Sequence, residues 1–470
     1  MIDLRQLERL DFAGKNVTVV GLGIEGVDFV RYLARRGAHV TISDSKPRAK
    51  LADRLHDVDG LDVSLSLGKN DERTVTRADA VFISQSVPLD LPGLSAARSL
   101  GVPLHSMVGL FLELAPGPVV GITGSSGKTT TTALVAEMMR ADGRDVFVGG
   151  NIGVGLLEHL VDLRPYTWSV LEVSHTQLQL VDRSPHIAAV LNITPNHLDR
   201  FSWDDYKRLK ANIIRHQEAA DIAILGYDDP ESRALGNEAR GRLGWFTMGA
   251  AAPGDSVFVR NGIAMARWSG AEEPLFSLSS VLLRGRHNQE NALAAAAIAL
   301  ASGVSPDAIA AGAGSFRGVQ HRLEYVAEID GAKYYNDSIA TTPERTLAGL
   351  RSFEQPIVLL LGGRDKNLPL SEMAREALGR CRGIVLFGEA AELLEEALRR
   401  EKNPGNVPIV RDGDLEQAVS TAHELAQPGD VVLLSPACTS YDAYDNFERR
   451  GEHFRALVRA GAEGGKSSPR

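Results

Sequence analysis

A loop rich in glycine, serine and threonine surrounds a single lysine and has the residue types that hold nucleotide phosphates. Its candidate ATP contacts are Ser125, Ser126, Gly127, Lys128, Thr129, Thr130 and Thr131. Backbone N–H groups in such a turn, and at the start of the following helix, point at bound phosphate. Lys128 is expected to reach the outer phosphates and Thr129 to ligate Mg²⁺. Ile122 stands where the common pattern has glycine, so the loop is a close relative of that pattern rather than a strict match. The sequence therefore predicts an enzyme that uses ATP.

A second glycine-rich turn, Gly21-Leu22-Gly23-Ile24-Glu25-Gly26, lies between an apolar run and a helical segment, and Asp44 ends the next apolar run. This arrangement indicates a Rossmann-like domain and, taken alone, NAD. A tight turn that binds no ligand is the alternative. A complete dinucleotide domain needs another βαβ half, and here the lysine loop begins instead. We therefore expect the chain to bind two different phosphate-bearing ligands.

Polar residues elsewhere in the chain offer metal ligands and base contacts. Glu172 ends an apolar run, and a carboxylate at the carboxyl end of a strand beside a phosphate loop is well placed for Mg²⁺. His197 follows another apolar run, although a lone histidine is more often a structural hydrogen-bond partner. Lys210 falls on the next helix, where the sequence alone predicts a solvated lysine. Asn288 and Asn291 either cap a helix or contact a base or ribose.

The elements that position these residues alternate between short apolar runs and segments of helical period, which predicts repeated βα units and the α/β class. The expected strands occupy residues 17–20, 40–43, 80–84, 119–123, 168–172, 187–192, 222–225, 357–361, 384–387 and 431–434. Interruptions near 101–105 and 312–321 divide the chain into three expected domains, 1–105, 106–318 and 319–470. The tail after position 463 is expected to be disordered.

Composition limits the function classes. The 470 residues include 51 basic and 60 acidic ones, and this net charge of -9 gives no global field to attract a polyanion, so nucleic acid is not an expected partner. Two cysteines are too few for a disulfide framework and fit a reducing cytosol. The charged N-terminus lacks the apolar stretch of a signal peptide, and the longest apolar run, 292–301, is roughly half a membrane span. We expect a cytoplasmic monomer with no membrane partner.

Taken together and in order, the motifs resemble the Mur ligase family. The resemblance covers nearly the whole chain and rests on segments 121–129, 150–153, 192–200, 287–291, 321–322, 336–338, 362–366, 435–440 and 446–447. It implies a Rossmann-like N-terminal domain for a UDP-sugar, a central P-loop ATPase domain and a C-terminal dinucleotide-fold domain that closes over the site. It also reassigns the first turn from NAD to the UDP-sugar, with expected contacts at Gly21, Gly23, Ile24, Glu25, Asp44 and Ser45.

The chemistry that the resemblance implies is amide formation on UDP-N-acetylmuramoyl-L-alanine. ATP phosphorylates the muramoyl-alanine carboxylate, and the amine of D-glutamate attacks the acyl phosphate. A carboxylate at neutral pH is a poor electrophile, so it must first gain a leaving group.

Site roles also follow from the resemblance. Lys128 neutralises the migrating phosphate, and Thr129, Glu172 and His197 belong to Mg²⁺ sites, where Lys210 corresponds to a carbamylated lysine. The muramoyl substrate is flanked by Asn151, Ser174 and His197. ATP is held by Asn288, Arg322 and Asp337, and glutamate is positioned by Lys366, Ser440 and Phe447.

The chain departs from the family pattern at three places. Ile339 replaces a lysine that often follows Asn336-Asp337-Ser338 and faces the glutamate carboxylates, and the segments 84–88 and 174–177 also differ. The alternatives that remain are a ligase that adds L-glutamate to the same nucleotide, a folylpolyglutamate-type ligase and a non-catalytic nucleotide-binding scaffold. The UDP-sugar turn argues against the folate ligase, and the set of Lys128, Glu172, His197 and Lys210 argues against the scaffold.

Overall fold

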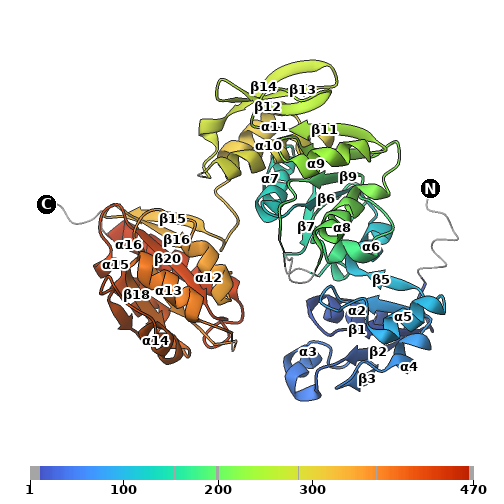
Figure 1. Ribbon diagram of the computed structural model, residues 1–470, viewed down its shortest axis with the longest axis horizontal. Coiled ribbons are helices and arrows are strands. Elements are labelled where there is room, and N and C mark those ends of the chain that lie inside the picture. The colour runs from blue at the N-terminus through green and yellow to red at the C-terminus, as the bar shows by residue number, and fades with distance from the viewer. Residues whose placement is uncertain (1–10, 153–154, 197–200, 284, 367, 465–470) are drawn as a thin grey trace. The chain divides into compact units, whose positions relative to one another are not determined.

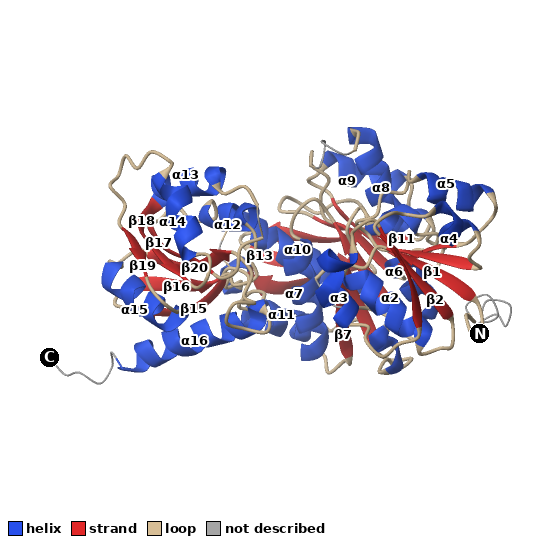
Figure 2. Ribbon diagram, turned by 90° about the horizontal axis from the view of Figure 1, so that it is seen from below, coloured by secondary structure: helices blue, strands red, loops and turns tan. Residues whose placement is uncertain are grey.

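The structure is a computed structural model that describes residues 11–152, 155–196, 201–283, 285–366 and 368–464. The chain divides at Phe316 into two compact units. In each unit, helices pack on parallel sheets (Figures 1 and 2). No helix in the described ranges is long and apolar enough to cross a membrane.

The first unit begins with a parallel five-stranded sheet. Its strands, in spatial order, are β3 (Val63–Leu67), β2 (His39–Asp44), β1 (Asn16–Val20), β4 (Ala80–Ile83) and β5 (Leu104–Ser106). The helices of this part are α2 (Ile24–Ala34), η1 (Arg48–Leu51), α3 (Ala52–His56), α4 (Glu72–Thr76), α5 (Pro92–Ser99) and α6 (Met107–Leu114). The order places β1 at the centre, so the turn after β1 opens at the carboxyl edge of the sheet.

A nine-stranded sheet forms the rest of the first unit. Its order is β14 (Ala271–Ser277), β13 (Ile263–Trp268), β12 (Asp255–Arg260), β11 (Arg242–Phe246), β10 (Ile222–Gly226), β9 (Ile187–Val190), β6 (Val119–Thr123), β8 (Trp168–Glu172) and β7 (Val146–Gly150). The strands from β7 to β12 run parallel, whereas β12, β13 and β14 form an antiparallel edge. The lysine loop thus follows β6, with β9 and β8 as its neighbours.

Helices surround this second sheet and fix its loops. They are α7 (Lys128–Ala141), η2 (Glu158–Val161), η3 (Gln177–Leu180), α8 (Trp203–Arg215), α9 (Pro230–Ala234), η4 (Leu235–Asn237), η5 (Leu278–Ser280), α10 (Arg286–Ala301) and α11 (Pro306–Ser315). Helix α7 packs with α10 and α11, while α8 packs against β9 and η3 (Figure 1). The two groups contribute different residues to the site, because α7 carries the lysine of the loop and α8 carries Lys210.

The second unit has a six-stranded sheet in the order β15 (Glu324–Ile329), β16 (Ala332–Asn336), β20 (Val431–Ala437), β17 (Ile357–Gly362), β18 (Cys381–Phe387) and β19 (Ile409–Arg411). Only the β15–β16 pair is antiparallel among the pairings of this sheet. Its helices are α12 (Pro343–Leu350), α13 (Ser371–Arg380), α14 (Ala391–Arg399), α15 (Leu415–Leu425) and α16 (Phe447–Gly464).

Strand β17 shows why this sheet is covered on both faces. Ile357, Leu359 and Leu361 belong to the hydrophobic cluster that includes α13 and α14, whereas Val358 and Leu360 belong to the cluster that includes α15 and α16. Successive side chains of a strand point to opposite faces, so a continuous apolar run fits a strand that is buried on both sides.

The α/β class is confirmed, and each of the ten expected strands corresponds to a strand of the structure. The expected strand at 187–192 ends earlier, at Val190, and the one at 384–387 begins earlier, at Cys381. The sequence also predicted no strand for β3, β5, β7, β11 or β19. Nor did it predict the antiparallel edge β12–β14 or the pair β15–β16. Those strands mix exposed and buried residues, so they lack the continuous apolar runs that marked the others.

Candidate functional site

The lysine loop connects β6 to α7 by a turn that only glycine fits well at position 127. Gly127 has φ of +81° and is the N-cap residue of α7. A Cβ on Gly127 would lie 2.3 Å from the side-chain oxygen of Asn291, which comes from α10. The hydroxyl of Thr131 donates to the same Asn291 oxygen over 3.4 Å. Helix α10 therefore packs directly against the phosphate loop through Asn291, while Asn288 lies one turn earlier.

The segment after β9 supports the loop from the other side. The backbone N–H of Ser125 donates to the carbonyl of Asn192 at 2.9 Å, and that of Ser126 donates to the Asn192 side chain at 2.9 Å. The hydroxyl of Ser125 donates to the Thr194 carbonyl at 3.0 Å. Strands β6 and β9 pair in parallel, so their carboxyl ends meet at one edge and these contacts follow. We did not predict a role for Asn192, although it lies in one of the ordered motifs.

Lys128 lies at the start of α7, and its Nζ donates to the Gly124 carbonyl at 3.0 Å. Thr129, Thr130 and Thr131 follow in the first helical turn, where Thr131 is fully buried. The N-terminus of a helix attracts anions because its free N–H groups and its dipole both favour negative charge. The loop therefore has the backbone conformation and the cation that phosphate binding needs.

Glu172 provides a carboxylate beside this loop. It ends β8, which pairs in parallel with β6, and it is 3% exposed. Its Oε1 accepts a hydrogen bond from the Asn151 side chain at 3.0 Å, whereas its Oε2 is buried with no hydrogen-bond partner. A buried carboxylate oxygen without a partner is costly unless a cation or donor completes it. This oxygen fits a Mg²⁺ ligand.

Lys210 is buried on α8, contrary to the solvated lysine that the sequence alone suggested. It is 1% exposed, and its Nζ lies 4.8 Å from the centroid of the Tyr206 ring. Desolvation by burial, and secondarily the charge of Lys128, lowers the pKa of Lys210 to about 7. A substantial fraction of its amine is therefore neutral near pH 7. The helical periodicity of the sequence could have indicated this burial, since Tyr206, Lys210 and Ile214 are spaced by four residues and lie on the buried face of α8.

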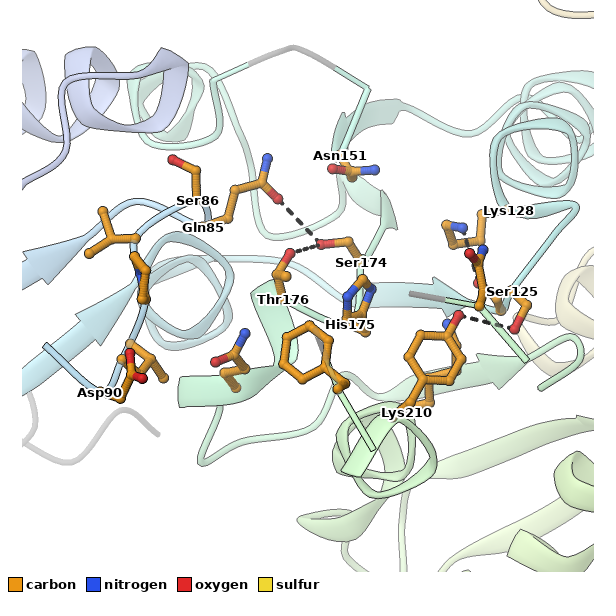
Figure 3. Close-up of a pocket in the computed structure, with 18 residues that line it drawn as sticks. Gln85, Ser86, Asp90, Ser125, Lys128, Asn151, Ser174, His175, Thr176 and Lys210 are labelled. Atoms are coloured by element: carbon orange, nitrogen blue, oxygen red, sulfur yellow. Dashed lines mark hydrogen bonds between the residues drawn. The ribbon is translucent and has the colours of Figure 1, made fainter. Parts of the chain in front are cut away.

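A cavity of about 930 Å³ joins these groups to the first sheet (Figure 3). Lys128, Asn151, Ser174 and Lys210 line it together with the loop 85–90, which follows β4. Figure 3 shows Gln85 and Ser174 on one side and Lys128 with Lys210 on the other. His197 was also expected here and lies outside the described residues. The described residues contain no group of three or more histidine, cysteine, aspartate or glutamate side chains that could hold a metal.

The first glycine turn is tightly built. Gly21 has φ of +87°, and its carbonyl accepts a hydrogen bond from the Ser84 hydroxyl at 2.6 Å. A Cβ on Gly26 would lie 2.1 Å from the Gly21 carbonyl oxygen. Asp44 is buried and accepts from the backbone N–H of Leu22 at 2.8 Å. The aspartate therefore orders the turn, while Gly23 and Ile24 open α2 and Ser45 is exposed after β2.

Glu25 connects this turn to the second sheet. Its carboxylate accepts from the Gln177 side chain and from the Gln85 backbone N–H, both at 2.8 Å. The other end of the Gln177 amide accepts from the Ser174 backbone N–H at 3.0 Å. Desolvation by burial raises the pKa of Glu25, and the two hydrogen bonds oppose that shift. Gln177, which the sequence did not single out, therefore ties the turn to the cavity wall.

Loops in the second unit carry the remaining predicted residues. Asp337 follows β16 and is 4% exposed; it accepts from the Ser435 hydroxyl at 2.8 Å and from the Leu323 N–H at 3.2 Å. Burial raises the pKa of Asp337 to about 7. Lys366 follows β17, and its Nζ donates to the Thr341 hydroxyl at 3.2 Å.

Arg450 connects these loops through its hydrogen bonds. The sequence did not predict a role for this residue. It is fully buried on α16, and its guanidinium donates to the Ser338 side chain and to the carbonyls of Ser338, Gly362, Cys438 and Thr439. Ser440 lies in the loop after β20 and Phe447 begins α16. Phe447 lies 6.2 Å from the His321 ring centroid, and Arg322 is the next residue along the chain.

These features define an α/β nucleotide-binding protein with two phosphate-type turns in its first unit. Three family models match the chain: the N-terminal domain of MurD-like Mur ligases at 15–106, the Mur ligase middle domain at 122–299, and the glutamate ligase domain of Mur ligases at 321–438. The chain belongs to the Mur ligase family.

Individual relatives of the chain also belong to this family. The chain is 43% identical to the UDP-N-acetylmuramoylalanine--D-glutamate ligase of Symbiobacterium thermophilum, covering 95% of this chain and 98% of that one. It is 38% identical to the ligase of the same name from Koribacter versatilis, covering 97% and 99%. Among solved structures, UDP-N-acetylmuramate-alanine ligase MurC from Thermotoga maritima matches with a TM-score of 0.51 at 17% identity, covering 95% and 99%. At that identity the structural match supports the fold alone.

Proposed function

We propose that this chain joins D-glutamate to UDP-N-acetylmuramoyl-L-alanine at the expense of ATP, as a step in making peptidoglycan precursors. Relatives that match this chain over nearly their full length are named UDP-N-acetylmuramoylalanine--D-glutamate ligase, and these names support the reaction. The observation that carries the proposal is the 930 Å³ cavity, because it places Lys128 of the phosphate loop opposite Gln85 and Ser174 of the wall that faces the first sheet.

The reaction needs two steps. The alanine carboxylate first attacks the γ-phosphorus of ATP, which forms an acyl phosphate and releases ADP. The glutamate amine then attacks the acyl carbon, inorganic phosphate leaves, and the amine loses a proton. Lys128 at the N-terminus of α7 would counter the charge that builds on the transferred phosphoryl group.

Mg²⁺ fits the residues at this edge of the sheet. When bound, it would stabilise negative charge on the phosphates. We propose Glu172 and Thr129 as ligands, together with His197. The partnerless Oε2 of Glu172 supports this assignment, while Asn151 holds the other carboxylate oxygen in place.

We further propose that Lys210 is carbamylated. The neutral form of its amine, which is present near pH 7, is the form that attacks CO₂. The ammonium form of Lys210 is buried and has no hydrogen-bond acceptor among the described residues, whereas the carbamate would be a carboxylate. This change removes an unpaired buried cation beside Lys128 and adds a hard oxygen ligand.

In the same proposal, Gly21, Gly23, Ile24, Glu25, Asp44 and Ser45 serve the UDP-sugar, partly by shaping the turn. Asn288, Arg322 and Asp337 serve ATP, and Lys366, Ser440 and Phe447 position glutamate. We also retain the domain limits 1–105, 106–318 and 319–470, a monomeric state and a cytoplasmic location as proposals. The family-model ranges support the domain limits.

Phosphate release from ATP tests the reaction, with UDP-N-acetylmuramoyl-L-alanine and each enantiomer of glutamate as separate acceptors. We expect turnover that requires both the nucleotide and D-glutamate, with a much lower kcat/KM for L-glutamate. A preference for L-glutamate would support the alternative acceptor and leave the ligase chemistry in place. A rate of ATP hydrolysis that depends on neither the nucleotide substrate nor glutamate would contradict the proposal.

A further inference from the structure

The second unit contains two cations that form no ion pair with a carboxylate among its described residues. They are Arg345, in the first turns of α12, and Lys366, in the loop after β17. Neither takes part in an ion pair of the described chain. Burial is the main cause that lowers the pKa of Lys366, and the charge of Arg345 is the next. The charge of Arg345 therefore disfavours the protonated form of Lys366.

Such a pair stands out against the rest of the unit. Its surface arginines mostly have acidic partners: Arg351, Arg364, Arg375, Arg380, Arg382, Arg399, Arg400, Arg411, Arg449 and Arg455. Arg364 is the nearest cation to Lys366 in sequence, and its guanidinium makes a two-pronged pair with Glu389 at 2.8 and 3.1 Å. Arg364 is therefore already engaged in an ion pair.

Geometry places Arg345 at the position where the family pattern is broken. Its Nη1 donates to the Ile339 carbonyl at 3.2 Å, so its guanidinium lies against the residue that replaces the usual lysine. Thr341, two residues after Ile339, accepts the hydrogen bond from Lys366 at 3.2 Å. Both cationic side chains thus donate hydrogen bonds to one short segment, residues 339–341.

The loops that carry this segment are well ordered by their own contacts. Strands β16, β17 and β20 run parallel, so their carboxyl ends meet at one edge. Arg450 is buried beneath that edge and donates to the carbonyls of Ser338 after β16, of Gly362 at the end of β17 and of Thr439 after β20. The guanidinium N–H groups of Arg450 are bound to these carbonyls, so Arg450 supports the loops. The exposed cations at this edge are therefore Arg345 and Lys366.

We propose that Arg345 is a specificity-determining residue that binds one carboxylate of the amino-acid acceptor, in place of the lysine that Ile339 has removed. This inference rests on the proposed ligase function. The acceptor carries two carboxylates, and the desolvation cost of binding them is offset by nearby cations and hydrogen-bond donors. A guanidinium can bind a carboxylate through two parallel hydrogen bonds, which fixes its orientation.

The main rival role for Arg345 is contact with ATP. Its charge also acts on Asp337, a proposed ATP residue, although burial dominates the pKa of that carboxyl. Asp337 is already bonded to Ser435 and Leu323, and its hydrogen bonds do not involve Arg345. Steady-state kinetics separates the two roles, since each substrate has its own KM.

The test compares Arg345→Gln and Arg345→Lys with the unaltered enzyme, varying glutamate and ATP in turn. We expect Arg345→Gln to raise the glutamate KM by roughly tenfold or more, as expected for a lost charge-assisted hydrogen bond, and to leave the ATP KM within about twofold. Arg345→Lys should retain part of the affinity. The double variant Arg345→Gln with Ile339→Lys should regain affinity, because it returns a cation to the same edge.

Arg351→Gln is the matched control, since Arg351 lies at the C-terminal end of the same helix and pairs with Glu372 and Glu376. It should leave both KM values unchanged. An unchanged glutamate KM in Arg345→Gln, or an equal rise in the ATP KM, would overturn the inference. If the unaltered enzyme prefers L-glutamate, the proposed acceptor is wrong, yet the Arg345 comparison stands with that substrate. Absence of any amino-acid-dependent turnover overturns both.

Discussion

Lys210 illustrates how burial changes the chemistry of one residue. In water its amine would be almost wholly protonated at pH 7, but 1% exposure and the nearby Lys128 lower its pKa to about 7. Its neighbour Lys207, on the same helix, pairs instead with Asp204 and Glu231, and those partners raise its pKa. Two lysines three positions apart thus differ in which form they hold at neutral pH.

We predict that Lys210→Ala is nearly inactive and that added acetate or formate restores part of the activity. The small carboxylate would occupy the space of the proposed carbamate and supply an oxygen at the same edge of the sheet. Lys207→Ala is the control and should keep most of its activity. Intact mass spectrometry and activity assays with graded formate measure the effect. Full activity of Lys210→Ala would remove Lys210 from the site.

Individual residues also show what the sequence could and could not reveal. Lys128 and Glu172 could be singled out because residue type and position near the end of a strand suffice, and their roles stay predictions. The parallel pairing of β6 and β8 places the ends of their strands side by side. Asn192 and Gln177 were missed, because an amide that supports a loop has no distinctive spacing. Arg450 was missed for the same reason: a buried arginine bound to carbonyls looks in sequence like any helix arginine.

At the scale of elements, helix α2 is one connection between the two parts of the first unit. Asp28 on α2 is 2% exposed, and its carboxylate accepts from the backbone N–H groups of Leu156, Leu157 and Glu158 at 2.6, 2.9 and 3.0 Å. Arg31, one turn later, pairs with Glu158 at 3.1 Å. A single hydrophobic cluster also includes residues from both sheets. The parts on either side should therefore unfold together.

We predict that Asp28→Ala destabilises the protein by about 3 kcal/mol or more, because it leaves three backbone N–H groups without their acceptor, two of them buried. Chemical denaturation measures the free energy of unfolding. Asp59→Ala is the control, since that exposed carboxylate pairs only with His56 at the surface, and it should change stability by less than about 1 kcal/mol. Similar losses in both variants would contradict the bridging role of Asp28.

The contact between α7 and α10 gives another prediction at this scale. Gly127→Ala adds a methyl group at φ of +81°, where it would overlap Asn291, so we expect a loss of stability and a large loss of ATP affinity. Gly143→Ala is matched to it, because Gly143 has φ of +76° near the other end of α7 but has no atom within 4 Å of the added Cβ. That control should cost about 1 kcal/mol of backbone strain and leave ATP binding intact. Equal effects in calorimetry with ATP would argue against the overlap.

Elements differ in how readily the sequence predicts them. The buried strands of all three sheets appear as apolar runs, because helices cover both of their faces. The antiparallel edge β12–β14 has a solvated face, so its apolar residues are interrupted and the periodicity is short. The two compact units divide after Phe316, within the glycine-rich segment 312–321, while the three domain limits expected from the sequence stay a prediction.

For the whole molecule, the central feature is that one chain carries two phosphate-type turns on two sheets of one unit. In the turn after β1, Asp44 accepts from the backbone N–H groups of Leu22 and Lys46, and Glu25 accepts from Gln85 and Gln177. Gln177 and Ser174 lie between this turn and the loop after β6, on the wall of the cavity. A substrate that spans the cavity could therefore bind by its nucleotide at the first turn and present its carboxylate at the second.

This arrangement predicts that Lys128→Ala abolishes ligation while UDP-N-acetylmuramoyl-L-alanine still binds with nearly unchanged affinity. In the proposed function the lysine serves the transferred phosphoryl group. Its contact with the Gly124 carbonyl is local, so its removal should leave the first turn intact. Isothermal titration calorimetry with the UDP-sugar measures the affinity, and phosphate release measures the reaction. Gly21→Ala should behave in the opposite way, because a Cβ there would lie 2.6 Å from the Val87 side chain and distort the first turn. A large loss of UDP-sugar affinity in Lys128→Ala would show that the two turns form one site rather than two.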